Sequence, residues 1–151
     1  MRLFLDANVL FSAAHNRNGN ARALCSLADQ GIATLRCSYF ARDEAIRNID
    51  LKFPNCRETL TALLQGIEQV PEPSPSLVET AMAVGMPQKD APILAAALAA
   101  RADIMVTGDK RHFGKLFGER VNGVVVLSPA DALAMMLTRI TQQPPKLPNG
   151  A

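Results

Sequence analysis

The sequence predicts an α/β fold with a central parallel sheet covered by helices on both faces. Short apolar segments alternate with amphipathic ones along the chain, which is typical of strands joined by helices. The 151 residues are 48% hydrophobic, enough for one sizeable core. Two predicted strands are followed by an aspartate, Asp6 and Asp109, at the sheet end where such folds bind ligands. We expect one domain over residues 1–141 and a flexible tail over 142–151, whose prolines and polar residues are typical of disorder.

The first third of the chain predicts a strand, a helix, a second helix and a second strand. Arg2–Leu5 is a short apolar strand, and Asp6 precedes an apolar run that begins a helix. Asn8 is expected to cap that helix or to hydrogen-bond to Asp6. A helix over 21–30 and a strand over 32–37 follow.

A third helix is expected to start after Ser38, a good N-cap residue, and to run to Ile49. Glu44 lies about one and a half turns into it and can point toward the sheet end that carries Asp6. A solvated helix acid is the more common role of a glutamate. Residues 55–69 then predict a further helix, since their leucines and one isoleucine recur at helical spacing.

The second half of the chain places two more acids near strand and helix ends. Ser76 and Glu79 form a capping-box pattern that predicts a helix over 76–84. A helix over 90–101 opens at Asp90, and a strand over 104–107 leads into Asp109. A basic segment, a strand over 124–127 and a helix to residue 140 complete the domain.

Charge, cysteine content and hydropathy indicate the cellular compartment and the kinds of partner to expect. The net charge of +2 neither requires nor opposes a polyanionic partner. The three cysteines, Cys25, Cys37 and Cys56, are far apart and odd in number, which favours free thiols in a reducing compartment. The sequence has neither a signal-peptide pattern nor an apolar run long enough to span a membrane. We therefore expect a cytoplasmic protein without a membrane partner.

Four acids are candidates for one site: Asp6, Glu44, Asp90 and Asp109. Taken singly, Asp90 is more often a helix cap and Asp109 a turn former. In one crevice the four carboxylates would repel each other, and a divalent cation would offset that repulsion. An all-oxygen ligand set favours Mg²⁺ or Mn²⁺, and such a site suits phosphodiester hydrolysis by an activated water.

Four motifs, taken in order, resemble the PIN domain family. They are Phe4–Leu10 (FLDANVL), Ser38 with Glu44, Asp90–Ala97 (DAPILAAA) and Val106–Lys110 (VTGDK). The resemblance covers about Met1 to Leu127 and implies a three-layer α/β/α fold. It also implies a Mg²⁺- or Mn²⁺-dependent endoribonuclease that cleaves single-stranded RNA, and possible membership of a toxin–antitoxin pair of the VapC type with an antitoxin protein as partner. Carried over by position, Asp6, Glu44, Asp90 and Asp109 are catalytic and hold the metal, while Asn8 and Thr107 support them.

Two other function classes remain open. A phosphatase of the haloacid dehalogenase type also begins with a strand and an aspartate, but it needs an acid where this chain has Asn8. Its late motif would need an acid where this chain has Phe113. A non-catalytic PIN-like binding scaffold is the other alternative, and the presence of all four acids argues against it.

Side chains beside the acids give weaker indications of a nucleic-acid path. Tyr39 and Phe40 can stack on bases, although core packing is the better expectation for Phe40. His15 and His112 are expected to be surface or helix-end histidines. The surplus of apolar helix faces, together with the resemblance, predicts a homodimer. Six basic residues could lie near the crevice: Arg47, Lys52, Lys89, Lys110, Arg111 and Lys115.

Overall fold

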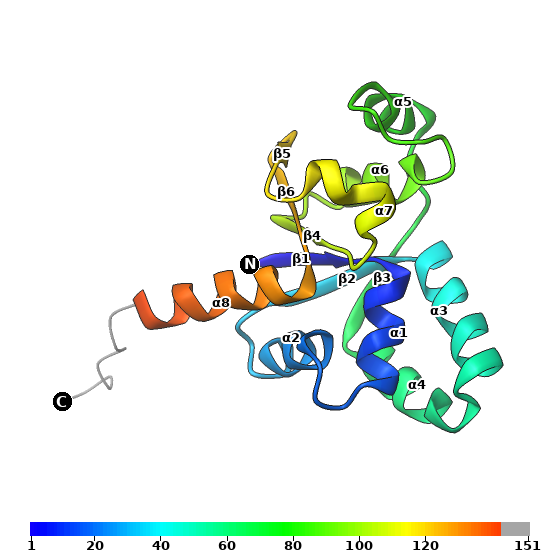
Figure 1. The fold of residues 1–151 in the computed structure, drawn as a ribbon, viewed down its shortest axis with the longest axis vertical. Helices are drawn as coiled ribbons and strands as arrows, with labels where there is room; N and C mark the ends of the chain where they lie inside the picture. The colour runs from blue at the N-terminus through cyan, green and yellow to red at the C-terminus, as the bar shows by residue number, and fades with distance from the viewer. Residues whose placement is uncertain (143–151) are drawn as a thin grey trace.

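The computed structural model describes residues 1–142, which form a three-layer α/β/α sandwich around one six-stranded sheet (Figure 1). The strand order is β3-β2-β1-β4-β6-β5. All neighbouring strands pair in parallel except β5, which is antiparallel to β6. The strands are β1 (Arg2–Leu5), β2 (Thr34–Ser38), β3 (Ile67–Val70), β4 (Ile104–Val106), β5 (Arg120–Val121) and β6 (Val124–Leu127).

Helices cover both faces of the sheet, as the sequence predicts. Figure 1 shows α5, α6 and α7 on one side and α1, α2, α4 and α8 on the other, with α3 beside α1. The helices are α1 (Ala7–His15), α2 (Asn20–Asp29), α3 (Tyr39–Lys52), α4 (Arg57–Gln65), α5 (Pro75–Ala83), α6 (Ala91–Ala99), α7 (Lys110–Phe113) and α8 (Pro129–Gln142). Two short 3₁₀ turns, Pro54–Cys56 and Gly114–Leu116, follow α3 and α7.

The switch in strand order lies between β1 and β4. From β1 the chain builds β2 and β3 on one side and then returns to place β4 on the other. Leu5 pairs with Val106, and the Asp6 amide donates to the Val106 carbonyl at 3.0 Å. Since parallel strands end at the same edge, the residues that follow β1 and β4 are neighbours at the switch point, where open α/β sheets bind ligands.

The core lies on both faces of the central strands. Leu3, Phe4 and Leu5 of β1 are all buried, as expected for a parallel strand covered on both faces. Helix α6 is buried over most of its length, and Ala95, Ala96 and Ala97 are inaccessible to solvent. Their small side chains let α6 approach the sheet closely, which brings its N-terminal residue Asp90 near the switch point.

The predicted helix over 55–69 is wrong over its last four residues, 66–69. The structure has a 3₁₀ turn, then α4 to Gln65, and then the edge strand β3 from Ile67 to Val70. Gly66 separates the two elements. Ile67 lies at helical spacing from Leu60 and Leu64, so the periodicity could not distinguish a strand residue from a fourth helix turn.

The capping predictions had mixed outcomes. Ser38 caps α3 as expected, and its side chain accepts a hydrogen bond from the Ala41 amide at 3.0 Å. The predicted capping box at Ser76 is wrong, because α5 begins at Pro75 with Ser74 in the N-cap position. Helix α8 includes Gln142, the first residue of the predicted tail, and the remaining residues of that prediction, 143–151, lie outside the described part.

The cysteines agree with the expectation of free, partly buried thiols. Cys25 and Cys37 are free and buried, and burial raises the pKa of each thiol to about 11. Cys56 is free and half-buried. None of the helices within residues 1–142 combines the length and the apolar character needed to cross a bilayer.

Candidate active site

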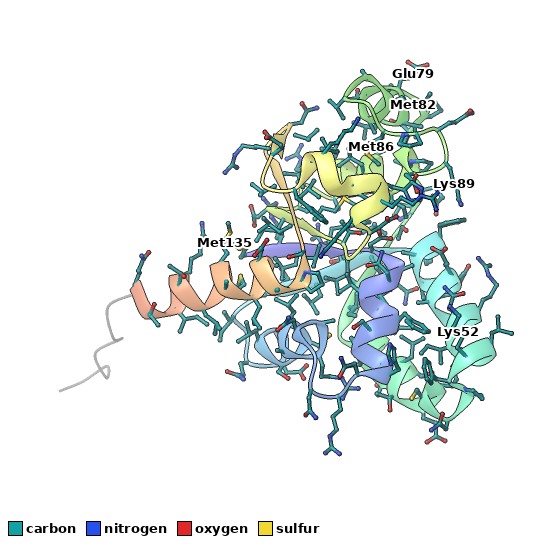
Figure 2. All side chains as sticks on the ribbon, viewed as in Figure 1. Lys52, Glu79, Met82, Met86, Lys89 and Met135 are labelled. Carbon is teal, nitrogen blue, oxygen red and sulfur yellow. The ribbon has the colours of Figure 1, made fainter. Side chains whose placement is uncertain are left out.

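The four acids predicted from the sequence line one crevice of ≈ 320 Å³ at the switch point. Asp6 follows β1, Asp109 precedes α7, Asp90 precedes α6, and Glu44 projects from the second turn of α3. Lys52 and Lys89 also line the crevice, and Figure 2 shows them well apart, Lys89 beside the loop before α6 and Lys52 toward the end of α3. The remaining lining residues are Ala7, Asn8, Phe11, Phe40, Asn48, Ile93, His112 and Phe113.

Asp6 is the most buried of these acids, with 6% of its surface exposed. One carboxylate oxygen accepts a hydrogen bond from the Ala7 amide at 2.7 Å and thereby caps α1. The other accepts from the Thr107 hydroxyl at 2.8 Å and from the Asn8 amide at 3.1 Å. Burial raises the pKa of Asp6 despite the hydrogen bonds from Thr107 and Ala7, and the charges of Glu44 and Asp109 raise it further.

A network of hydrogen bonds joins the ends of β1 and β4. The Asn8 side chain donates to the Thr107 hydroxyl at 3.3 Å and accepts from the Gly108 amide at 2.7 Å. The Thr107 hydroxyl, which donates to Asp6, also accepts from the Asp109 amide at 3.1 Å. A Cβ at Gly108 would stand 3.2 Å from the Asn8 carbonyl oxygen, so glycine permits this close approach. Asn8 and Thr107 thus fix Asp6 relative to Asp109.

Asp109 is bound mainly by His112. Its Oδ1 accepts from the His112 amide at 3.1 Å, which caps α7, and its Oδ2 lies 2.7 Å from His112 Nδ1. Partial burial alone would raise the pKa of Asp109, but the side-chain and backbone hydrogen bonds of His112 outweigh it and lower the pKa. Asp109 is therefore an ionised acid held in a fixed orientation.

Asp90 occupies the N-cap position of α6, but its side chain makes no capping hydrogen bond. Within residues 1–142, its Oδ2 is fully buried and has no hydrogen-bond partner, although His112 Nδ1 lies 3.9 Å away. A buried carboxylate oxygen without a donor is unfavourable unless a cation compensates it. The interpretation of Asp90 as a plain helix cap is thus not supported.

The donor set fits a hard divalent cation. Asp90, Asp109 and His112 each offer one ligand atom, and these atoms lie within 4.8 Å of one another. Asp6 and Glu44 add two carboxylates to the same crevice. The four carboxylates suit Mg²⁺ or Mn²⁺, because both ions prefer oxygen ligands. The free Oδ2 of Asp90 is the observation that argues for such an ion.

Several of the residues around the acids differ from the sequence-based expectations. His112 was expected at the surface or at a helix end; it lies in the last turn of α7, and its ring bonds to Asp109 inside the crevice. Its position three residues after an N-cap aspartate was the available signal, because that spacing brings the two side chains together. Phe40 is 53% exposed and lines the crevice, so the expectation that it packs in the core is wrong. Of the six basic residues considered, all within the described chain, Lys52 and Lys89 alone line the crevice.

Structural comparison places this fold beside several solved proteins. VapBC2 from Rickettsia felis, bound to a DNA fragment from its promoter, matches with a TM-score of 0.62 and 16% identity over 85% of this chain and 98% of that chain. PAE2754 from Pyrobaculum aerophilum matches with a TM-score of 0.60 and 14% identity, over 91% of this chain and 96% of that chain. A toxin–antitoxin complex from Klebsiella pneumoniae matches with a TM-score of 0.56 and 18% identity, over 82% of this chain and 95% of that chain. At these identities the likeness shows a shared fold.

Sequence comparison gives the family. None of the curated proteins matches this chain in sequence. The PIN domain family model matches residues 2–111, which include all four crevice acids and the Asn8–Thr107 network. The match therefore covers most of the chain and the whole of the crevice's acidic part, and the chain belongs to the PIN domain family.

Proposed function

We propose that this protein is a metal-dependent endoribonuclease that cleaves single-stranded RNA. PIN domain proteins are nucleases, and the chain carries a full set of acids for that chemistry. One observation carries the proposal: four carboxylates converge at the switch point, and Oδ2 of Asp90 is buried there without a partner in the described residues.

Asp6, Glu44, Asp90 and Asp109 would hold Mg²⁺ or Mn²⁺, and His112 offers a nitrogen ligand beside Asp90 and Asp109. The ion, when bound, activates a water molecule for attack on the phosphodiester and stabilises the leaving oxygen.

The chain's own residues position the ligands. Thr107 and Asn8 donate to Asp6 and so fix the direction of its second oxygen. His112 holds Asp109 through both its amide and its ring. This order before the ion arrives lowers the cost of arranging the ligands around it.

The lining of the crevice supports a single nucleic-acid strand as substrate. Lys52 and Lys89 line the crevice, lie well apart in Figure 2, and can each neutralise a phosphate of the strand. Phe11 and Phe40 offer apolar surface to unstacked bases. A base buried in a duplex would not reach these rings, so the arrangement favours a single strand.

Neither alternative function is supported by a specific observation. A phosphatase of the haloacid dehalogenase type needs an acid at position 8. The Asn8 side-chain amide instead hydrogen-bonds to Asp6, Thr107 and Gly108. The late phosphatase motif needs a second acid at position 113, but that position is occupied by Phe113, which is buried. In the scaffold interpretation the crowded acids would bring repulsion without any compensating role.

Partners and compartment belong to the same proposal. One structural relative is a toxin–antitoxin complex, which supports an antitoxin as the protein partner of this chain. We also propose a cytoplasmic location, in keeping with the free cysteines. We further propose a homodimer, because Met82 and Val84 in the α5 region are exposed apolar residues. A light-scattering mass that remains monomeric at high concentration would contradict the dimer.

Cleavage assays on fluorescent single-stranded RNA test the proposed reaction. We expect Asp6→Asn and Asp109→Asn to lower the rate by at least about 100-fold, since a metal supplies several kcal/mol of transition-state stabilisation. EDTA should stop the wild-type reaction, and added Mn²⁺ should restore it. Far-ultraviolet circular dichroism of both variants should match the wild type.

A matched pair on α3 provides the control. Glu44 lines the crevice, whereas Asp43 is exposed and outside it. Glu44→Gln should lose most of the activity, and Asp43→Asn should keep it within about twofold, as expected for a surface change away from the site. Cleavage that persists in EDTA, or a wild-type rate in either crevice-aspartate variant, would disprove the mechanism.

A further inference from the structure

The crevice extends from the acids along the seam between α1 and α3. Its α3 wall consists of residues spaced by four: Phe40, Glu44, Asn48 and Lys52. Residues at this spacing share one face of a helix, so they form a continuous stripe along α3. The stripe starts beside the acids and carries a lysine near the helix C-terminus.

The α1 wall shows the same spacing. Ala7 and Phe11 line the crevice, and His15 follows Phe11 after four more residues. Helices α1 and α3 lie side by side (Figure 1). Ala7 and Phe11 of α1 and the stripe on α3 line the same crevice, and we call this part of it the channel. The channel leads from Asp6 and Glu44 to a group of aromatic rings.

That group, the aromatic end, consists of Phe11, His15 and Phe53. The His15 and Phe53 rings are stacked, with centroids 4.6 Å apart and planes at 8°. Phe11 packs against both, at 4.7 Å from His15 and 5.8 Å from Phe53. His15 and Phe53 are exposed, and Phe53 keeps 39% of its surface accessible. Stacked rings that remain exposed offer a surface to which a further planar group can add.

A positive charge lies beside the rings. The Lys52 Nζ is 5.5 Å from the centroid of Phe11, and Lys52 is the last crevice residue of the α3 stripe. Eight helical residues separate Glu44 from Lys52, a distance of about 12 Å along the axis. An extended nucleic-acid strand covers that distance in a few nucleotides. A ring platform with one adjacent cation matches the two parts of a nucleotide, its base and its phosphate.

We propose that the aromatic end is a base-binding subsite for the RNA strand, with Lys52 as its phosphate contact. This assignment rests on the proposed function, because the strand that reaches the aromatic end is the one held at the acids. The base extends the His15–Phe53 stack, and Asn48 lies along the strand between the two points. Every base presents a flat face, so the subsite selects an unpaired nucleotide at a fixed position and not a particular base.

Binding measurements in an inactive background test the subsite. The background is Asp109→Asn with Mg²⁺ present, and fluorescence anisotropy of a labelled single-stranded RNA gives the affinity. Phe53→Ala should weaken binding by about 10-fold, the usual range for loss of one stacked base. Lys52→Ala should also weaken binding, and the slope of log affinity against log salt should fall by about 0.7, as for one lost phosphate contact.

A positional readout separates base stacking from general loss of affinity. 2-Aminopurine placed in turn along the RNA should be quenched at one position, a few nucleotides to one side of the bond that wild-type protein cleaves. The quenching should disappear in Phe53→Ala and in His15→Ala, which provides a second variant with an exposed side chain. Melting temperatures of all the variants establish that they are folded.

Two matched controls belong to the same experiment. Leu51→Ala removes a neighbouring side chain that is 78% exposed and outside the crevice. Lys115→Ala removes an exposed lysine that does not line the crevice. Both should keep the wild-type affinity and the quenching pattern within about twofold.

The outcomes distinguish this subsite from the nuclease itself. Unchanged affinity and quenching in Phe53→Ala and His15→Ala would overturn the proposal and leave the aromatic end to another partner, such as a protein. Equal losses in the Leu51→Ala control would overturn it too. Phe53-dependent quenching in a protein whose wild type cleaves no RNA would support the subsite and contradict the nuclease.

Discussion

The ends of β1 and β4 form two versions of one local structure. In each, a buried strand leads to an aspartate that caps the next helix, Asp6 for α1 and Asp109 for α7. The two carboxylates nevertheless have opposite electrostatics, since the pKa of Asp6 is raised and that of Asp109 is lowered. The shared hydrogen-bonding element is Thr107, whose hydroxyl donates to Asp6 and accepts from the Asp109 amide.

The opposite pKa shifts of Asp6 and Asp109 arise from the surroundings of each carboxylate and not from the shared strand–aspartate–helix motif. Asp6 is almost fully buried and receives neutral donors, so desolvation dominates its pKa. Asp109 keeps 27% of its side chain exposed and has His112 against both oxygens, so the partner dominates. A bound cation would help Asp6 more, because a buried charge gains most from a counter-charge. Asp109 thus has a counter-charge within the chain, His112, whereas Asp6 would gain one only from a bound cation.

The largest expected effect is that of the metal on stability. Mn²⁺ at about 100 times its dissociation constant should stabilise the fold by about 2.7 kcal/mol and raise the melting temperature by about 5–10 °C. Asp6→Asn should lose most of this rise, because it removes the buried charge that the ion compensates. Calorimetric melting curves with EDTA and with Mn²⁺ measure both quantities.

Asp43→Asn is the control for the metal effect, since Asp43 is exposed on α3 and outside the crevice. It should show the full rise. A rise in Asp6→Asn as large as in the wild type would mean that the ion does not bind at the switch point.

A smaller effect is expected from the residue that joins the two acids. Thr107→Val keeps the shape of the side chain but removes a buried donor from Asp6 and the acceptor for the Asp109 amide. Such losses cost about 2 kcal/mol, which lowers the melting temperature by about 4–8 °C. Thermal unfolding in EDTA followed by circular dichroism gives the shift.

Thr61→Val is the matched change on α4, where the hydroxyl is exposed and donates to the Arg57 carbonyl. It should alter stability by no more than about 0.5 kcal/mol. Equal shifts for the two threonines would show that the Thr107 network does not hold the strand ends together.

The smallest effect is the pH dependence, in which the two acids should differ in sign. The raised pKa of folded Asp6 means that its contribution to stability is fully present below its reference pKa of 3.8 and is lost as the pH rises through the folded pKa. Asp6→Asn should therefore gain stability relative to the wild type between pH 4 and pH 7. Melting curves in EDTA at several pH values measure this difference.

Asp109 should show the reverse. Its lowered pKa makes a contribution that is present above 3.8 and is lost as the pH falls through the folded pKa. The disadvantage of Asp109→Asn should therefore shrink as the pH falls toward pH 3. Two variants whose stability differences change in the same direction would refute the contrast between the junctions.

The sequence alone could place the acids but not their neighbours. Asp6 and Asp109 follow apolar strands, and parallel strands end at one edge, so their convergence followed from topology. The contact between His112 and Asp109 depends on a helix of four residues, Lys110–Phe113, which is too short for periodicity to reveal. The exposure of Phe40 depends on which face of α3 meets α1, and composition does not determine that.

The fold shows the same limit at the β3 edge. The sequence predicts one helix over residues 55–69, because Leu60, Leu64 and Ile67 share one helical face. Ile67 instead pairs with Leu35 of β2 in the sheet. Tertiary pairing selected the strand where local spacing allowed both, which is usual for short apolar segments.

The pairing of Asp6 with Thr107 determines when the acidic crevice can assemble during synthesis of the chain. The two residues are 101 positions apart, and the oxygen of one is bonded by the hydroxyl of the other. A growing chain displays Asp6 almost at once, yet β1 cannot gain its β4 neighbour until the ribosome has made that later strand. Any N-terminal fragment that stops before Thr107 lacks half of the acid pair and the hydroxyl that orients the rest. A prematurely terminated translation product therefore cannot assemble the acidic crevice.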